Sequence, residues 1–186
     1  MATKTASDVL AFSKLIGVLK HLKRTGWVKR EVDGPETVAG HMYRMALLAF
    51  LLNDGSVDRD RCIRMALVHD LGEAIVGDIT PHCGVSDQDK YEREKAAMER
   101  IAELVPNEVG KELVELWQEY EKGETAEARA VKQLDKFDMM AQAHEYEQVE
   151  GKSGRLEEFF STAPTAFTTE PFLSWSDQLK TARKKE

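Results

Sequence analysis

Residues 67–78 read LVHDLGEAIVGD, and they place ionisable side chains in a segment with the apolar character of a buried helix. The four groups are His69, Asp70, Glu73 and Asp78. A buried ion destabilises a fold by several kcal/mol unless an opposite charge or a metal accompanies it. In a continuous helix Glu73 lies on the face of His69 and Asp70, one turn further on. The stretch therefore predicts a cluster of polar groups that a binding partner must neutralise.

Helical periodicity extends over the rest of the chain. Apolar residues recur at three- and four-residue steps, and no segment alternates as a strand does. The predicted helices begin near Ser7 or Asp8 and then cover about residues 36–52, 58–76, 97–105, 109–120 and 125–146, with a C-terminal amphipathic helix over about 170–183. Residues 78–89 read as a loop. We therefore predict one all-α domain of six or more helices over residues 1–186.

Composition excludes several classes of function. The chain of 186 residues carries a net charge of −7, and its basic residues are scattered rather than gathered on one face. This pattern disfavours a nucleic-acid polymer as partner. No apolar run approaches the roughly 20 residues of a membrane span, so we expect no membrane partner. Cys62 and Cys83 have no motif spacing, which favours free thiols and a cytoplasmic location.

Two further predicted helices place a polar residue on an apolar face. His41 shares its face with Val38 and Met45, and Asp135 lies four residues after Val131. Taken singly, such a residue is more often a hydrogen-bonded core group or the partner of an arginine. The arginines available for such pairing are Arg44, Arg61 and Arg64. Taken together, the groups indicate a divalent cation, because one cation would neutralise several of them.

Three strings carry a family resemblance. HMYRMA begins at His41, HDLGEAIVGDITP begins at His69, and KQLDKFDMMAQAHEYE ends at Glu147. Together they resemble the HD-domain phosphohydrolase superfamily, whose signature H…HD…D supplies metal ligands from separate helices. RTGWVKREVDGPETVAGH and GEAIVGDITP resemble its 5'-deoxynucleotidase branch. The resemblance covers about residues 10–157, and it implies an all-α HD domain.

The resemblance implies a site for one divalent metal ion. Its ligands would be His41, His69, Asp70 and Asp135, with Asp138 as the alternative to Asp135. Two imidazoles and two carboxylates without a thiolate suit a borderline to hard cation. The family suggests Mn or Co, and the donor set also admits Mg, Fe, Ni or Zn.

The resemblance also implies catalytic and substrate-binding residues. Glu73 would act as the base or proton shuttle, and Asp78 would be catalytic or orient the substrate. Residues Asp78, Ile79, Thr80 and Pro81 would line a nucleotide pocket. The family uses an Arg-Trp pair for substrate binding. Here Gly26 precedes Trp27, so Arg24 is the nearest preceding arginine and Arg30 is the second candidate.

The implied activity is the hydrolysis of deoxyribonucleoside 5'-monophosphates to deoxynucleoside and phosphate by a metal-activated water. One alternative is another HD phosphohydrolase activity on a dNTP, a cyclic nucleotide or ppGpp. The other alternative is a metal-binding helical module without catalysis. The family also suggests a homodimer. Trp117, Phe159 and Phe160 are candidates for its interface, and they serve equally well as core residues.

Overall fold

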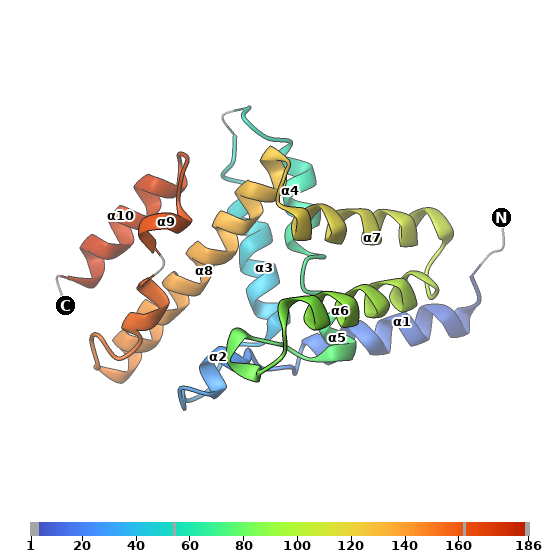
Figure 1. Ribbon diagram of the computed structural model, residues 1–186, viewed down its shortest axis with the longest axis horizontal. Coiled ribbons are helices and arrows are strands. Elements are labelled where there is room, and N and C mark those ends of the chain that lie inside the picture. The colour runs from blue at the N-terminus through green and yellow to red at the C-terminus, as the bar shows by residue number, and fades with distance from the viewer. Residues whose placement is uncertain (1–3, 54, 162, 185–186) are drawn as a thin grey trace.

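The computed structural model describes residues 4–53, 55–161 and 163–184, and these residues form a bundle of helices (Figure 1). The described ranges contain no strand, and their only β-type pairing is an isolated bridge between Lys23 and Thr37. The all-α prediction is therefore confirmed. The helices are α1 (Ala6–Leu19), α2 (Thr25–Val28), α3 (Val38–Ala49), α4 (Arg59–Ala66), α5 (Glu73–Val76), α6 (Asp87–Ala102), α7 (Asn107–Lys122), α8 (Ala126–Glu150), α9 (Ala163–Ala166) and α10 (Phe172–Arg183). Two 3₁₀ turns, η1 (Pro81–Cys83) and η2 (Glu157–Phe160), complete the list.

Local capping sets several helix ends. The Thr5 hydroxyl accepts the Asp8 N–H at 3.2 Å, and the Asp8 carboxylate accepts the Thr5 N–H at 2.9 Å. This capping box makes Thr5 the N-cap of α1, which begins at Ala6, in place of the predicted cap at Ser7 or Asp8. Gly123 and Gly151 end α7 and α8 in the left-handed conformation that glycine adopts most easily.

The longest helix, α8, organises the bundle. It packs on α3, α4 and α7, and α10 lies along it near the C-terminus (Figure 1). The helices α6 and α7 lie beside each other, and α1 contacts α5. The core is a continuous cluster that includes Met45, Met65, Leu134 and Trp117, all at most 2% exposed. Trp117 therefore belongs to the core rather than to an interface.

The helix predicted over residues 58–76 is broken, which corrects the sequence interpretation. The helix α4 ends at Ala66 and α5 begins at Glu73, with tight turns between them. His69 Nδ1 lies 3.0 Å from the carbonyl oxygen of Ala66, an acceptor that a continuous helix would use for the N–H of Asp70. A side-chain bond to the backbone thus competes with the helix. The His-Asp pair lies in the turn and not late in a helix.

The structure contains short elements that the sequence did not reveal. The single-turn helix α2 and the 3₁₀ turn η1 fall in segments predicted as loops, and η2 follows α8.

The described residues include no helix with the length and apolar character of a bilayer span. Cys62 is buried, Cys83 is exposed, and both are free thiols.

Candidate metal centre

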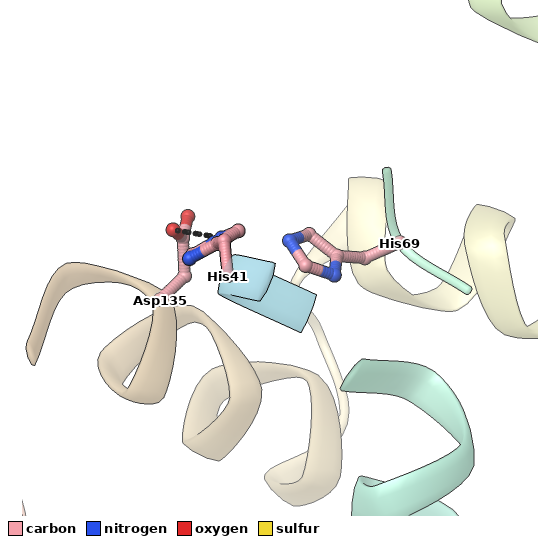
Figure 2. Close-up of side chains that lie close together, drawn as sticks. All are labelled: His41, His69 and Asp135. Atoms are coloured by element: carbon pink, nitrogen blue, oxygen red, sulfur yellow. Dashed lines mark ion pairs between the residues drawn. The ribbon is translucent and has the colours of Figure 1, made fainter. Parts of the chain in front are cut away.

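Three separate elements bring the predicted ligands together. His41 comes from α3, Asp135 from α8, and His69 and Asp70 from the turn between α4 and α5. Figure 2 shows the side chains of His41, His69 and Asp135 close together, with the ion pair between His41 and Asp135. One ligand atom from each of His41, His69 and Asp135 lies within 4.8 Å of the others. Asp70 Oδ2 lies 3.2 Å from His69 Nε2 and 3.8 Å from His41 Nε2.

Both imidazoles are held in the orientation that a metal ligand needs. His41 Nδ1 lies 2.7 Å from Asp138 Oδ2, and His69 Nδ1 lies 3.0 Å from the Ala66 carbonyl. Nδ1–H donation to these acceptors leaves an Nε2 lone pair on each ring pointing into the cluster. Both Nε2 atoms are buried and have no hydrogen-bond partner among the described residues. In metal sites, the histidine nitrogen that does not bind the metal commonly donates to a carboxylate or a backbone carbonyl. The two Nε2 atoms and the neighbouring aspartates therefore fit a divalent cation.

Asp135 and Asp138 occupy different positions around His41. Asp135 Oδ1 lies 3.2 Å from His41 Nε2, on the side of the cluster, and Tyr120 donates a 2.9 Å hydrogen bond to the other oxygen. Asp138 is fully buried behind the ring, where it accepts hydrogen bonds from His41 Nδ1 and Arg44 Nε. Glu36, His41 and Asp138 also come close enough to hold a metal. Because His41 Nδ1 already bonds Asp138 while the unpartnered Nε2 lies on the side of Asp135, the geometry favours Asp135 as the ligand.

The charges of the cluster are strongly coupled. Burial opposes ionisation of Asp70, yet His69, His41 and Arg24 hold the pKa of its carboxyl at about 2. Burial and the positive charge of Arg24 lower the pKa of His41. Hydrogen bonds with Asp135 and Asp138 outweigh them and raise this pKa to about 9. A cation must therefore compete with a proton on His41.

Glu73, at the start of α5, is a buried carboxyl group. Its side chain is almost inaccessible, and Oε2 has no hydrogen-bond partner among the described residues. Burial, reinforced by the negative charges of Asp70 and Asp78, raises the pKa of Glu73 well above its ordinary value. A carboxyl group whose pKa is raised in this way can hold a proton and release it during a reaction.

A cavity of about 300 Å³ adjoins the cluster. Of the predicted substrate residues, Arg24, Trp27, Asp78, Thr80 and Pro81 line it. Ile79 is not among the described residues that line this cavity. The volume is at the lower end of the range for ligand pockets. Arg24 joins the cavity to the cluster, because its guanidinium also lies 3.5 Å from Asp70 and 3.9 Å from Asp135.

Asp78 and Trp27 position the walls of the cavity. Asp78 Oδ2 accepts the backbone N–H of Thr25 at 2.5 Å, and the Thr25 hydroxyl donates to the Asp78 carbonyl at 2.8 Å. These bonds tie α2 to the segment after α5. Trp27 is 1% exposed, and its indole N–H donates to Glu36 at 2.9 Å. Arg30 forms an ion pair with Glu158 instead of approaching the cluster.

Sequence reasoning missed several residues of the site. Tyr120 donates to Asp135, and nothing in its spacing marks it. Arg44, named above as an available partner for an aspartate, pairs with Asp138. Asp138 was weighed only as a ligand, although its position one turn after Asp135 could have suggested a supporting role. Phe159 lines the cavity from η2, and only the fold brings that segment next to α2.

Comparison with known proteins agrees with this geometry. The profile of the HD domain family matches residues 16–171. The human protein "5'-deoxynucleotidase HDDC2" is 46% identical over 178 residues, covering 96% of this chain and 87% of the relative. The "5'-deoxynucleotidase YGK1" of Saccharomyces cerevisiae is 38% identical over 174 residues, covering 91% and 80%. The crystal structure of the PH0347 protein from Pyrococcus horikoshii superposes with a TM-score of 0.75 at 29% identity, covering 98% and 100% of the two chains. The chain therefore belongs to the HD domain family.

Proposed function

We propose that this chain is a metal-dependent 5'-deoxynucleotidase, a phosphoric monoester hydrolase acting on deoxyribonucleoside 5'-monophosphates. The observation that carries the proposal is the pair of buried imidazole nitrogens without hydrogen-bond partners beside two aspartates, which Arg24 joins to a ligand-sized cavity. The similarity to curated 5'-deoxynucleotidases over nearly the whole chain supports the same activity.

The proposed metal ligands are His41, His69, Asp70 and Asp135. A divalent cation held there supplies positive charge for the phosphoryl oxygens and acidifies water. The choice of Mn or Co remains a prediction from the family resemblance, and the oxygen and nitrogen donors do not separate these metals. The extent of the domain, residues 1–186, is likewise a prediction.

The chain's own groups account for substrate binding and proton transfer. Arg24 is the proposed phosphate contact, because it is the arginine that faces both the cluster and the cavity. Glu73 gives its proton to the 5'-oxygen as the bond from that oxygen to phosphorus breaks, and its carboxylate then takes a proton from the attacking water. Asp78 holds α2 in place and orients the substrate beside Trp27.

An activity panel tests the proposal. Wild-type protein with Mn or Co should release phosphate from deoxyribonucleoside 5'-monophosphates, and Asp70→Ala should abolish that release. Absence of release with every metal tried, or full release by Asp70→Ala, would overturn the proposal. Pyrophosphate or triphosphate as product would identify another HD phosphohydrolase activity. A metal that raises the melting temperature without any phosphate-ester hydrolysis would identify a non-catalytic module.

We also propose a homodimer, through exposed apolar residues at the C-terminal end of α3. Tyr43 and Leu47 lie on α3, Phe50 and Leu51 lie in the turn that follows it, and the four are 64%, 49%, 52% and 56% exposed. Exposed apolar residues that gather into one patch are typical of an interaction site. The dimer should dissociate in Leu47→Asp, and light scattering after gel filtration measures this directly. A wild-type monomer would contradict the proposal. The cytoplasmic location remains a prediction.

A further inference from the structure

The residues that line the cavity differ in chemistry. We call the part lined by Arg24 and Asp78 the inner end, because Arg24 also contacts the metal-binding cluster. We call the part lined by Phe159 and Met139 the outer end, and the Arg30–Glu158 pair, which also lines the cavity, its rim. The proposed phosphate site uses only the inner end. The outer end therefore has no role in the phosphoryl chemistry described above.

Phe159 forms an aromatic wall at the outer end. Its ring centroid lies 4.4 Å from that of Trp27, and a Cβ added at Gly26 would lie 3.6 Å from its edge. The guanidinium carbon of Arg30 lies 5.5 Å from the same ring centroid. The side chain is held on these sides and still lines the cavity. An aromatic ring fixed in this manner offers a surface for another flat ring.

The charged groups at the rim neutralise each other. Arg30 donates from Nε and Nη2 to the two carboxylate oxygens of Glu158, and its Nη2 lies 3.3 Å from His82 Nε2. The loop that carries Arg30 is also anchored, because Arg155 donates to the carbonyl of Glu31 at 3.1 Å. The outer end thus combines an aromatic wall with the internally paired Arg30–Glu158 rim, and Lys136 on α8 is a further cation of the cavity lining. The aromatic wall is the part of this surface that suits a flat heteroaromatic ring.

We propose that the Phe159 wall and the Arg30–Glu158 rim form the nucleobase subsite of the enzyme. The inference rests on the proposed function, and it assigns to the outer end the part of the substrate that the metal cluster does not touch. A 5'-phosphate and a base lie at opposite ends of a nucleotide, so a phosphate at Arg24 directs the base outward. Contact with a ring face tolerates all bases, because every base has such a face.

Comparison of a nucleotide with an abasic substrate tests this subsite. The measurement is the ratio of kcat/KM for a deoxyribonucleoside 5'-monophosphate to kcat/KM for 2-deoxyribose 5-phosphate. Phe159→Ala should lower this ratio about 5- to 100-fold, as expected for one lost aromatic contact with a base. Phe159→Leu, which keeps apolar packing on α2, should lower it less than the alanine variant does. Val28→Ala is the matched control, because Val28 lies half-exposed on α2 and does not line the cavity.

Two outcomes would overturn the subsite. One is an equal loss on both substrates in Phe159→Ala, which would show that Phe159 only supports Trp27. The other is a wild-type ratio near one, which would show that the base makes no contact. Calorimetry with the deoxynucleoside product separates this inference from the proposed function, because binding requires no hydrolysis. Binding that weakens about 5- to 100-fold in Phe159→Ala supports the subsite even if phosphate release fails, and binding unchanged by the substitution refutes it.

Discussion

Asp138→Asn should weaken metal binding without removing a proposed ligand. Asp138 is fully buried and uses one oxygen for His41 Nδ1, at 2.7 Å, and the other for Arg44. The asparagine has nearly the same shape but only one oxygen, so one of these two donors loses its acceptor. Even where the amide oxygen stays on Nδ1 it carries no charge, so in either orientation the imidazole loses the carboxylate that supports its tautomer and its basicity.

The magnitude follows from these contacts. Loss of such a supporting partner typically lowers metal affinity about 10- to 100-fold, which corresponds to about 1.4–2.8 kcal/mol. The free energy of unfolding should fall as well, by about 1.5–3 kcal/mol, the usual contribution of a hydrogen bond to a charged group. Arg44 limits this second loss, because it keeps its contacts with Glu145 at 3.0 and 3.1 Å.

The assay is a calorimetric titration of wild type and variant with Mn, together with urea unfolding in the presence of chelator. Glu145→Gln is the matched control: it removes charge from the other carboxylate on Arg44, on the same helix, without touching His41. Its metal affinity should equal that of wild type. An Asp138→Asn affinity within threefold of wild type would refute the supporting role. A loss larger than that of Asp135→Asn would identify Asp138 as the ligand instead.

Three further substitutions test other features of the fold and site. Tyr120→Phe removes the 2.9 Å hydrogen bond to Asp135 and should lower metal affinity by up to about tenfold, measured in the same titration; unchanged affinity would contradict the assignment of Asp135. Burial above all raises the pKa of Glu94, a residue of α6, from 4.5 to about 7. The protonated carboxyl group therefore contributes its full share to the free energy of unfolding below pH 4.5, and this contribution is lost as the pH rises to 7. The melting temperature of Glu94→Gln relative to wild type should therefore increase over this interval and level off above it, and a constant difference would show that the shift is absent. A Cβ at Gly110 would lie 2.6 Å from a backbone carbonyl of α6, so Gly110→Ala should reduce the free energy of unfolding by about 1–3 kcal/mol in urea denaturation. Gly17→Ala, with nothing within 4 Å, should instead stabilise α1 by up to about 1 kcal/mol, and equal effects of the two alanines would refute the packing argument.

The sequence predicted the helical class from its local apolar periodicity, and the family resemblance supplied the set of residues that meet at the cluster. Apolar spacing identifies α3 and α8, and the polar exceptions on their faces identify His41 and Asp135. The different positions of Asp135 and Asp138 around the His41 ring could not be predicted from spacing. It depends on which nitrogen of His41 each carboxylate meets, and this follows from the packing of α3 on α8. Phe159 reaches the cavity only through the fold, since it lies more than 120 residues after α2 in the sequence.

The break between α4 and α5 explains how adjacent residues can serve one cation. Neighbouring side chains in a regular helix diverge by about 100° around the axis, so His69 and Asp70 would not face the same point. The tight turns bring Asp70 Oδ2 to 3.2 Å from His69 Nε2 and 3.8 Å from His41 Nε2. The bond from His69 Nδ1 to the Ala66 carbonyl lies at the start of this turn and orients the imidazole at the same time. A continuous helix would turn His69 and Asp70 away from each other, and the bond from His69 Nδ1 to the Ala66 carbonyl helps to end the helix before this happens. The same bond leaves His69 Nε2 available for the proposed metal ion.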